Sequence, residues 1–218
     1  VSGALGKGGY EGIQNDSAGN IYIVEDVGGP TGTTYPGSRQ PNSFIYRYVP
    51  ATPGDLGNGK LQVLQVIDVS GNPITFHAGQ IDADVKNDAI KSVYTYGIAL
   101  RAKWITIHDT ATDGKAFFDS NALAKAKGGT PLKRPENGVF RPDGKFTDFY
   151  FTTTGDTSAT TAVGADYGGF GGLEVSITRK DRNGKVWAPQ ERLTREEALK
   201  LVKEKGFTNY LETSALTG

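Results

Sequence analysis

The chain has 218 residues, and its 24 Lys and Arg residues balance 24 Asp and Glu residues, so the formal net charge is zero. This balance argues against a nucleic-acid binder, which needs a basic face. The absence of cysteine excludes disulfides, thiolate nucleophiles, zinc fingers and iron–sulfur ligation, and two histidines are too few for a multi-histidine metal site. No apolar run reaches the roughly 18 residues that a membrane span needs.

Short strands separated by turns are expected over most of the chain. The candidate segments are rich in β-branched and aromatic residues and are bounded by Gly, Pro, Asn and Asp. In chain order they are 21–24, 43–49, 61–67, 104–107 and 149–153. Residues 120–127 are expected to form a helix that Ser120 caps. Many short strands between frequent turns favour a sandwich, a barrel or a propeller.

A recurrent unit decides among these architectures. Glu11 and Gly12 open one copy, in which a strand, the turn 16–20 and a second strand lead to Glu25 and Asp26. The other copy begins at Glu136, runs through strand 149–153 and ends at Asp156. Such units are typical of propeller blades, whose inner strands point loops at a central channel. The sequence therefore predicts an all-β fold, a partial β-propeller of about three to four blades.

The composition changes near residue 173, because 27 of the 30 glycines precede residue 174. We expect two parts, a propeller portion at 1–173 and a helix-containing segment of uncertain origin at 174–218. A capping box at 194–197 predicts a helix over about 195–205 near the C-terminus, and a strand is expected at 209–215.

The order of several motifs resembles that of the PhoX-type alkaline phosphatase family over about residues 9–173. The motifs are 133–138, 149–156 and 167–172, preceded in the same order by 11–12, 22–26 and 43–56. The resemblance implies a six-bladed propeller that hydrolyses phosphate esters with metal ions in its channel. The metals that it implies are calcium and iron, and the implied location is the periplasm or the cell exterior.

The resemblance also implies roles for individual residues. Glu136 matches a metal-ligating glutamate and Arg134 a phosphate-contacting arginine, and these two are the candidate catalytic residues. The other candidate metal ligands are Glu11, Glu25, Asp26 and Asp156. The chemistry is reasonable in itself, because calcium takes several oxygen ligands, arginine presents a planar fork to phosphate, and metals polarise phosphoryl groups.

Departures from the family pattern leave alternatives open. The phosphatases proper supply a cysteine ligand to iron, which this chain lacks, and their later acidic ligands are not recognisable here. The chain is then a fragment of such a hydrolase, or it completes the propeller by self-association. The alternative is a non-enzymatic, calcium-stabilised extracellular propeller or surface-assembly protein.

The tail and the histidines carry weaker signals. Residues 193–218 resemble the C-terminal part of Ras-like small GTPases through 212–215, but the chain has no phosphate-binding loop motif, so GTP binding is not expected. His77 and His108 are expected to do structural or surface work.

Overall fold

A computed structural model describes residues 2–95, 98–141, 145–146 and 148–155, which all belong to the first of two units, 1–170 and 171–218. The tail helix and strand expected at 195–205 and 209–215 lie outside the described residues, and so does the glycine-rich motif at 167–172. The boundary expected near residue 173 stays a prediction.

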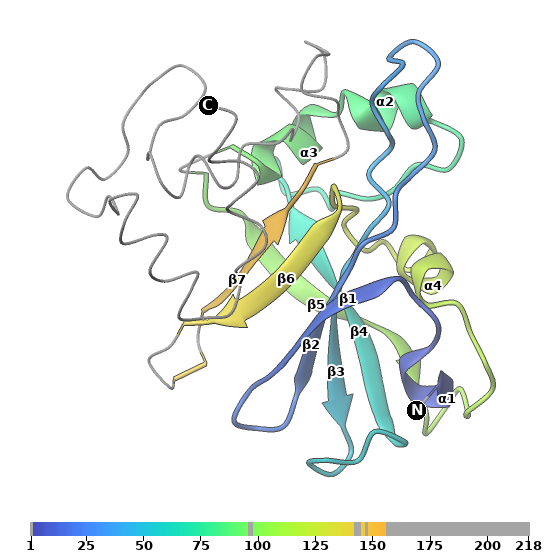
Figure 1. The fold of residues 1–218 in the computed structure, drawn as a ribbon, viewed down its shortest axis with the longest axis vertical. Coiled ribbons are helices and arrows are strands. Elements are labelled where there is room, and N and C mark those ends of the chain that lie inside the picture. Colours follow the sequence, from blue (N-terminus) through green and yellow to red (C-terminus); the bar gives the residue numbers. More distant parts are fainter. Residues whose placement is uncertain (1, 96–97, 142–144, 147, 156–218) are drawn as a thin grey trace, which may run out of the picture. The chain divides into compact units, whose positions relative to one another are not determined.

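Two antiparallel sheets make up the described fold (Figure 1). The larger sheet has the order β1-β2-β3-β4-β5, so each strand pairs with its neighbours in sequence. Its strands are β1 (Tyr10–Asn15), β2 (Ile21–Glu25), β3 (Ile45–Pro50), β4 (Gly59–Ile67) and β5 (Arg101–Asp109). The smaller sheet is a hairpin of β6 (Pro135–Phe140) and β7 (Phe149–Thr153).

The expected β character is confirmed. Each of the five predicted segments overlaps a strand, and 149–153 matches β7. The recurrent unit is also confirmed as a pair of hairpins, β1–β2 and β6–β7. A propeller blade has four strands, whereas the larger sheet has five, and no closed sheet is seen among the described residues. The number of blades therefore stays a prediction.

Four short helices interrupt the strands: α1 (Ser2–Leu5), α2 (Ile81–Val85), α3 (Asp88–Val93) and α4 (Ser120–Ala126). The helix expected at 120–127 is confirmed, but the expected cap is wrong. Asp119 is the N-cap, and its carboxylate accepts from Ala122 N at 2.9 Å, so Ser120 is the first helical residue. None of the helices in the described part of the chain is long and apolar enough to cross a membrane.

The expected turn at 16–20 is an Asx turn. Asp16 Oδ1 accepts from Ala18 N at 3.0 Å and from Asn20 N at 2.9 Å, while Gly19 adopts a φ of +82° that other residues rarely take. The same geometry recurs after β4, where Asp68 Oδ1 accepts from the backbone of Ser70 and Asn72, each at 2.8 Å. The turn at Asp16 joins β1 to β2 and thereby fixes the register of that hairpin.

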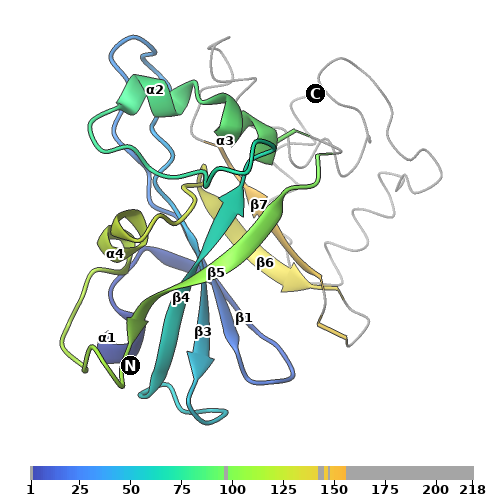
Figure 2. The same cartoon turned by 180° about the vertical axis from the view of Figure 1, so that it is seen from behind.

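The five-stranded sheet has α1 and α4 on one face and the β6–β7 hairpin on the other (Figures 1 and 2), and an apolar cluster lies on each face. Because side chains alternate along a strand, Ile23 belongs to one apolar cluster and Val24 to the other. The first cluster includes Ala4 of α1 and Ala124 of α4, which cover that face. The second cluster includes side chains of the β6–β7 hairpin on the opposite face, among them Phe149 and Phe151. The hairpin is thereby fixed against the sheet.

Glu25, at the end of β2, is fully buried on the face that α4 covers. Its carboxylate accepts hydrogen bonds from Gly9 N (3.3 Å), Phe44 N (3.1 Å), the Tyr46 hydroxyl (3.0 Å) and the Asn121 amide (2.9 Å). Burial raises the pKa of Glu25, and these four donors oppose that rise. The carboxylate thus joins the segment before β1, the β3 region and α4.

We expect Glu25→Ala to lower the free energy of unfolding by about 3 kcal/mol, because the Phe44 N–H and the Tyr46 hydroxyl would stay buried without their acceptor. Chemical denaturation measures this loss. The matched control is Glu11→Ala, at an exposed position, where the change should stay within about 0.5 kcal/mol. Equal losses in the two variants would contradict the role given to Glu25.

Candidate functional site

The two hairpins meet along β1 and β6, and β6 also contacts β2. Gly12 of β1 lies directly against β6, since a Cβ at this position would come within 2.9 Å of Asn137 Cα. A side chain there would push the hairpins apart. The close approach brings together the residues that precede these two, Glu11 and Glu136.

Both glutamates lie at β-bulges. In β1, Tyr10 pairs with Glu25 and Gly12 pairs with Val24, so Glu11 is the extra residue. In β6, the register shifts between Pro135 and Gly138, the stretch that holds Glu136. A bulge re-aims a side chain away from the regular alternation of the strand and is common beside active sites.

Arg134 and Asp26 form a two-pronged ion pair beside these bulges. Arg134 Nε lies 2.8 Å from Asp26 Oδ1, and Nη2 lies 2.9 Å from Oδ2. The side chains are 36% and 16% exposed, respectively. This fork geometry is the strong form of an arginine–carboxylate contact, and it fixes the plane of the guanidinium.

The backbone of Arg134 has a φ of +52°. This left-handed conformation costs a residue with a side chain roughly 1–2 kcal/mol, and it is unusual before a proline such as Pro135, because the residue before a proline favours extended conformations. Such strain persists only where the surroundings impose it, and it is concentrated at functional sites.

Neighbouring segments impose this conformation. Thr154 N donates to the carbonyl of Arg134 at 3.0 Å, and Gly155 N donates to the carbonyl of Lys133 at 3.2 Å. From the other side, Lys133 N donates to the hydroxyl of Tyr94 at 2.6 Å. The peptide before Arg134 is therefore held by the chain after β7 and by Tyr94, the C-cap residue of α3.

Glu136 lies near charges of both signs. Burial is the main cause that raises its pKa, and the carboxylates of Asp26 and Glu11 raise it further. A side-chain hydrogen bond with Thr154 and the charge of Arg134 act in the opposite direction. Mutually repelling carboxylates around a half-buried group are one arrangement that a bound cation would relieve.

The fold thus brings together four of the six expected site residues: Glu11, Asp26, Arg134 and Glu136. Glu25, the last residue of β2, lies apart from them, because its carboxylate is bound on the face that α4 covers, whereas the next residue, Asp26, pairs with Arg134. Asp156 lies outside the described residues.

The carboxylate oxygens of this cluster are the type of ligand that a hard cation such as calcium prefers, but they are fewer than calcium needs. Calcium takes about six to eight oxygen ligands, whereas Asp26 is already paired with Arg134 and leaves the carboxylates of Glu11 and Glu136. Within the described residues, no group of three or more His, Asp or Glu side chains is placed to hold a metal ion.

Sequence reasoning missed Tyr94 as part of this site. Tyr94 is 39 residues away from Lys133 in the chain, and no local motif marks it. Thr154 belongs to the motif at 149–156, but the sequence predicted no role for it in the site. Its two contacts, with the backbone of Arg134 and the side chain of Glu136, depend on the pairing of β6 with β7.

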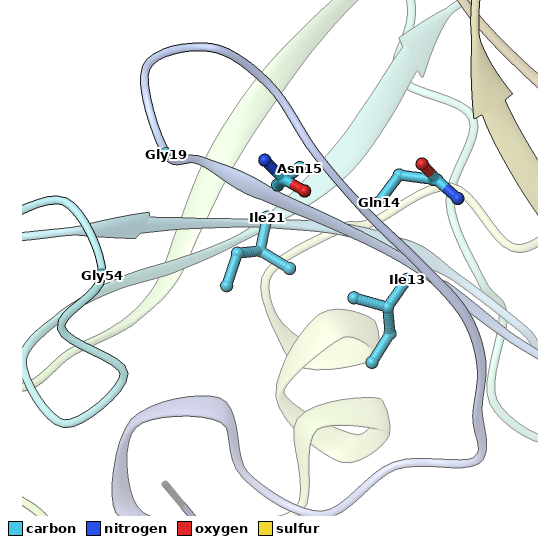
Figure 3. A pocket seen from close by; sticks show the side chains of 6 residues that line it. All are labelled: Ile13, Gln14, Asn15, Gly19, Ile21 and Gly54. Atoms are coloured by element: carbon cyan, nitrogen blue, oxygen red, sulfur yellow. The ribbon is translucent and has the colours of Figure 1, made fainter.

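A hollow of about 410 Å³ lies elsewhere, beside the β1–β2 turn (Figure 3). Its lining residues are Ile13, Gln14, Asn15, Gly19, Ile21 and Gly54. None of them carries a charge or a titratable group, so the side chains that line this hollow offer no acid or base. The chemistry is concentrated at the Arg134 cluster instead.

Comparisons with known proteins give one match. A family model described as alkaline phosphatase PhoX matches residues 18–209. The match includes Asp26, Arg134 and Glu136, begins after Glu11, and continues past the boundary expected near residue 173. No curated protein and no solved structure matches.

We expect Arg134→Gly to be more stable than Arg134→Ala by about 1 kcal/mol, because glycine adopts a positive φ without steric cost. Both variants lose the pair with Asp26, so the difference isolates the backbone term in chemical denaturation. At Arg141, which does not have a positive φ, the glycine variant should be no more stable than the alanine variant. A less stable glycine at position 134 would contradict the strained conformation.

We expect Glu11→Gln to lower the pKa of Glu136, because the substitution removes a negative charge that disfavours its ionised form. Carbon-13 NMR titration of the Glu136 carboxyl group measures this shift. Thr154→Val should act in the opposite direction, since it removes a hydrogen bond that stabilises the ionised form. If the pKa of Glu136 stayed unchanged in both variants, its expected interactions with Glu11 and Thr154 would be contradicted.

Proposed function

The chain belongs to the PhoX alkaline phosphatase family, and we propose that it hydrolyses phosphate esters at the cluster of Glu11, Asp26, Arg134 and Glu136. The observation that carries this proposal is the Arg134–Asp26 fork beside Glu136, inside the part of the chain that the family model matches. Family membership favours a hydrolase over the non-enzymatic alternative.

Arg134 is the proposed phosphate-binding residue. Asp26 accepts hydrogen bonds along the edge of the guanidinium formed by Nε and Nη2, which fixes the plane in which the guanidinium would meet a phosphate oxygen. A planar cation is matched to the spread negative charge of a phosphoryl group. The fixed backbone of Arg134 means that little reorganisation is needed when the substrate binds.

Glu11 and Glu136 are the proposed ligands of a calcium ion, with Asp156 as a further candidate. Glu25 is not proposed for this ion, because its buried carboxylate already accepts four hydrogen bonds on the face that α4 covers. A bound metal would polarise the phosphoryl group and activate the attacking oxygen nucleophile. Asp26 then acts mainly by orienting Arg134. Iron, the second metal that the resemblance implies, would have to be held by oxygen or nitrogen donors here, because the chain has no cysteine.

The proposal also includes the β-propeller fold, the source of the remaining metal ligands and the cellular location. The remaining ligands would come from residues outside the described part, from the remainder of a longer protein or from a second copy of the chain. The implied location is the periplasm or the cell exterior, and the substrate is a phosphate ester.

We expect hydrolysis of p-nitrophenyl phosphate in the presence of calcium, and loss of this activity after chelation with EGTA. Arg134→Ala should lower kcat/KM by about 100-fold, in line with the loss of a charged hydrogen bond worth about 1.5–3 kcal/mol. Arg134→Lys should recover only part of this loss, because lysine keeps the charge but not the fork.

Arg141→Ala is the matched control. Arg141 also pairs with an aspartate, Asp148, at 3.2 Å, but both side chains are about half exposed. Its activity should stay within twofold of the wild type. The proposal fails if the purified chain, alone and as part of any longer natural protein, has no chelator-sensitive phosphatase activity. Stabilisation by calcium without activity would instead favour the non-enzymatic alternative.

A further inference from the structure

A second group of polar side chains lies away from the Arg134 cluster, where residues 77–84 meet residue 40. Asp84, on α2, is fully buried, and its Oδ1 lies 2.7 Å from Nδ1 of His77. Asp84 Oδ2 accepts from His77 N at 2.9 Å and from the Gln40 amide at 2.8 Å. Three N–H groups therefore fix the carboxylate, and the carboxylate fixes the imidazole.

This arrangement decides the tautomer of His77. A buried carboxylate at Nδ1 keeps the proton on that nitrogen, so Nε2 carries the lone pair when the ring is neutral. The His77 side chain is 42% exposed, and within the described part of the chain no hydrogen bond is formed by its Nε2. The ring thus presents an oriented nitrogen lone pair to solvent, at a residue for which the sequence predicted structural or surface work.

His108 is a natural internal reference. Its side chain is 6% exposed, its ring stacks on Phe118 with 4.0 Å between centroids, and its Nε2 lies 3.1 Å from the carbonyl oxygen of Gly3. Both nitrogens face protein groups, since Nδ1 lies 3.8 Å from Asp113 Oδ2. Of the two histidines, only His77 has an accessible lone pair.

We propose that His77 and Asp84 form a nucleophilic dyad that hydrolyses activated carboxylic esters, an activity separate from phosphate-ester hydrolysis. Histidine is an established covalent nucleophile, and a carboxylate at Nδ1 stabilises the positive charge that develops on the ring. Asp82 and Asp84 place two carboxylates on α2, so an uncharged ester is favoured over an anionic phosphate.

The reaction proceeds in two steps. Nε2 of the neutral ring attacks the carbonyl carbon of the ester, the bond from that carbon to the leaving oxygen breaks, and the leaving group departs with the electron pair. Asp84 stabilises the resulting acyl-imidazolium through the Nδ1 proton. Water then attacks the acyl carbon, the carbon–nitrogen bond breaks with its electron pair returning to Nε2, and the carboxylic acid is released with the ring restored. The proton that the water loses goes to the departed alkoxide or phenoxide. The net change is ester plus water to acid plus alcohol or phenol.

The test is hydrolysis of p-nitrophenyl acetate by the full chain, compared with an equal concentration of N-acetylhistidine amide. We expect the protein to be at least about tenfold faster, a modest share of the range known for positioned acid–base groups. His77→Asn should remove this excess, because asparagine keeps an N–H donor for Asp84 but no nucleophile. Asp84→Asn should reduce it.

His108→Asn is the matched control and should retain the excess rate, with folding of each variant checked by circular dichroism.

Because these variants can affect folding, the wild-type protein is also labelled with diethyl pyrocarbonate. Mass spectrometry should locate the modification at His77, again about tenfold faster than on the reference amide. A rate no higher than that of the amide, or an excess that survives in His77→Asn, would overturn the proposal. EGTA should leave the acetate rate unchanged, so failure of the phosphatase proposal would be distinguishable.

Discussion

The end of β2 is the constraint on which both the core and the candidate site depend. Its last residue, Glu25, points toward α4 and is held by four donors, whereas Asp26 points toward β6 and is held by Arg134. Glu25 is the last residue of β2 and Asp26 follows the strand, so the two adjacent acids lie in different environments. The hydrogen bonds of Glu25 keep the end of β2 in place. The backbone of Asp26 is therefore fixed, and its carboxylate can orient the guanidinium of Arg134.

The hairpins could be predicted from the sequence, because their signals are local. Alternating strands, an Asx turn and a glutamate at the start of each unit are patterns of a few residues, whereas the roles expected for Glu11, Arg134 and Glu136 were implied by the family resemblance. The contact of Tyr94 with Lys133 and the dyad of His77 with Asp84 could not be predicted, since they depend on how loops and short helices pack. Glu25 and Asp26 looked equivalent because nothing local says which face of β2 is covered by α4.

The Arg134 cluster and the His77 dyad use carboxylates in different ways. Asp26 and Asp84 each accept hydrogen bonds from a basic side chain and thereby fix its orientation. Asp26 serves a permanent cation, which suits binding of an anion, whereas Asp84 serves a ring that can be neutral and thus nucleophilic. In the two proposals, the same kind of hydrogen bond serves anion binding at Arg134 and attack on an electrophilic carbon at His77.

The two bulges have an evolutionary consequence. In each hairpin the first strand holds one residue more than its partner, and the extra residue lies at Glu11 or in the stretch that holds Glu136. Removal of that single residue would restore regular pairing on both sides, so the core residues of the strands would keep their faces. Carboxylates at these two positions can therefore be gained or lost by the insertion or deletion of one codon, without repacking of the sheet beneath them.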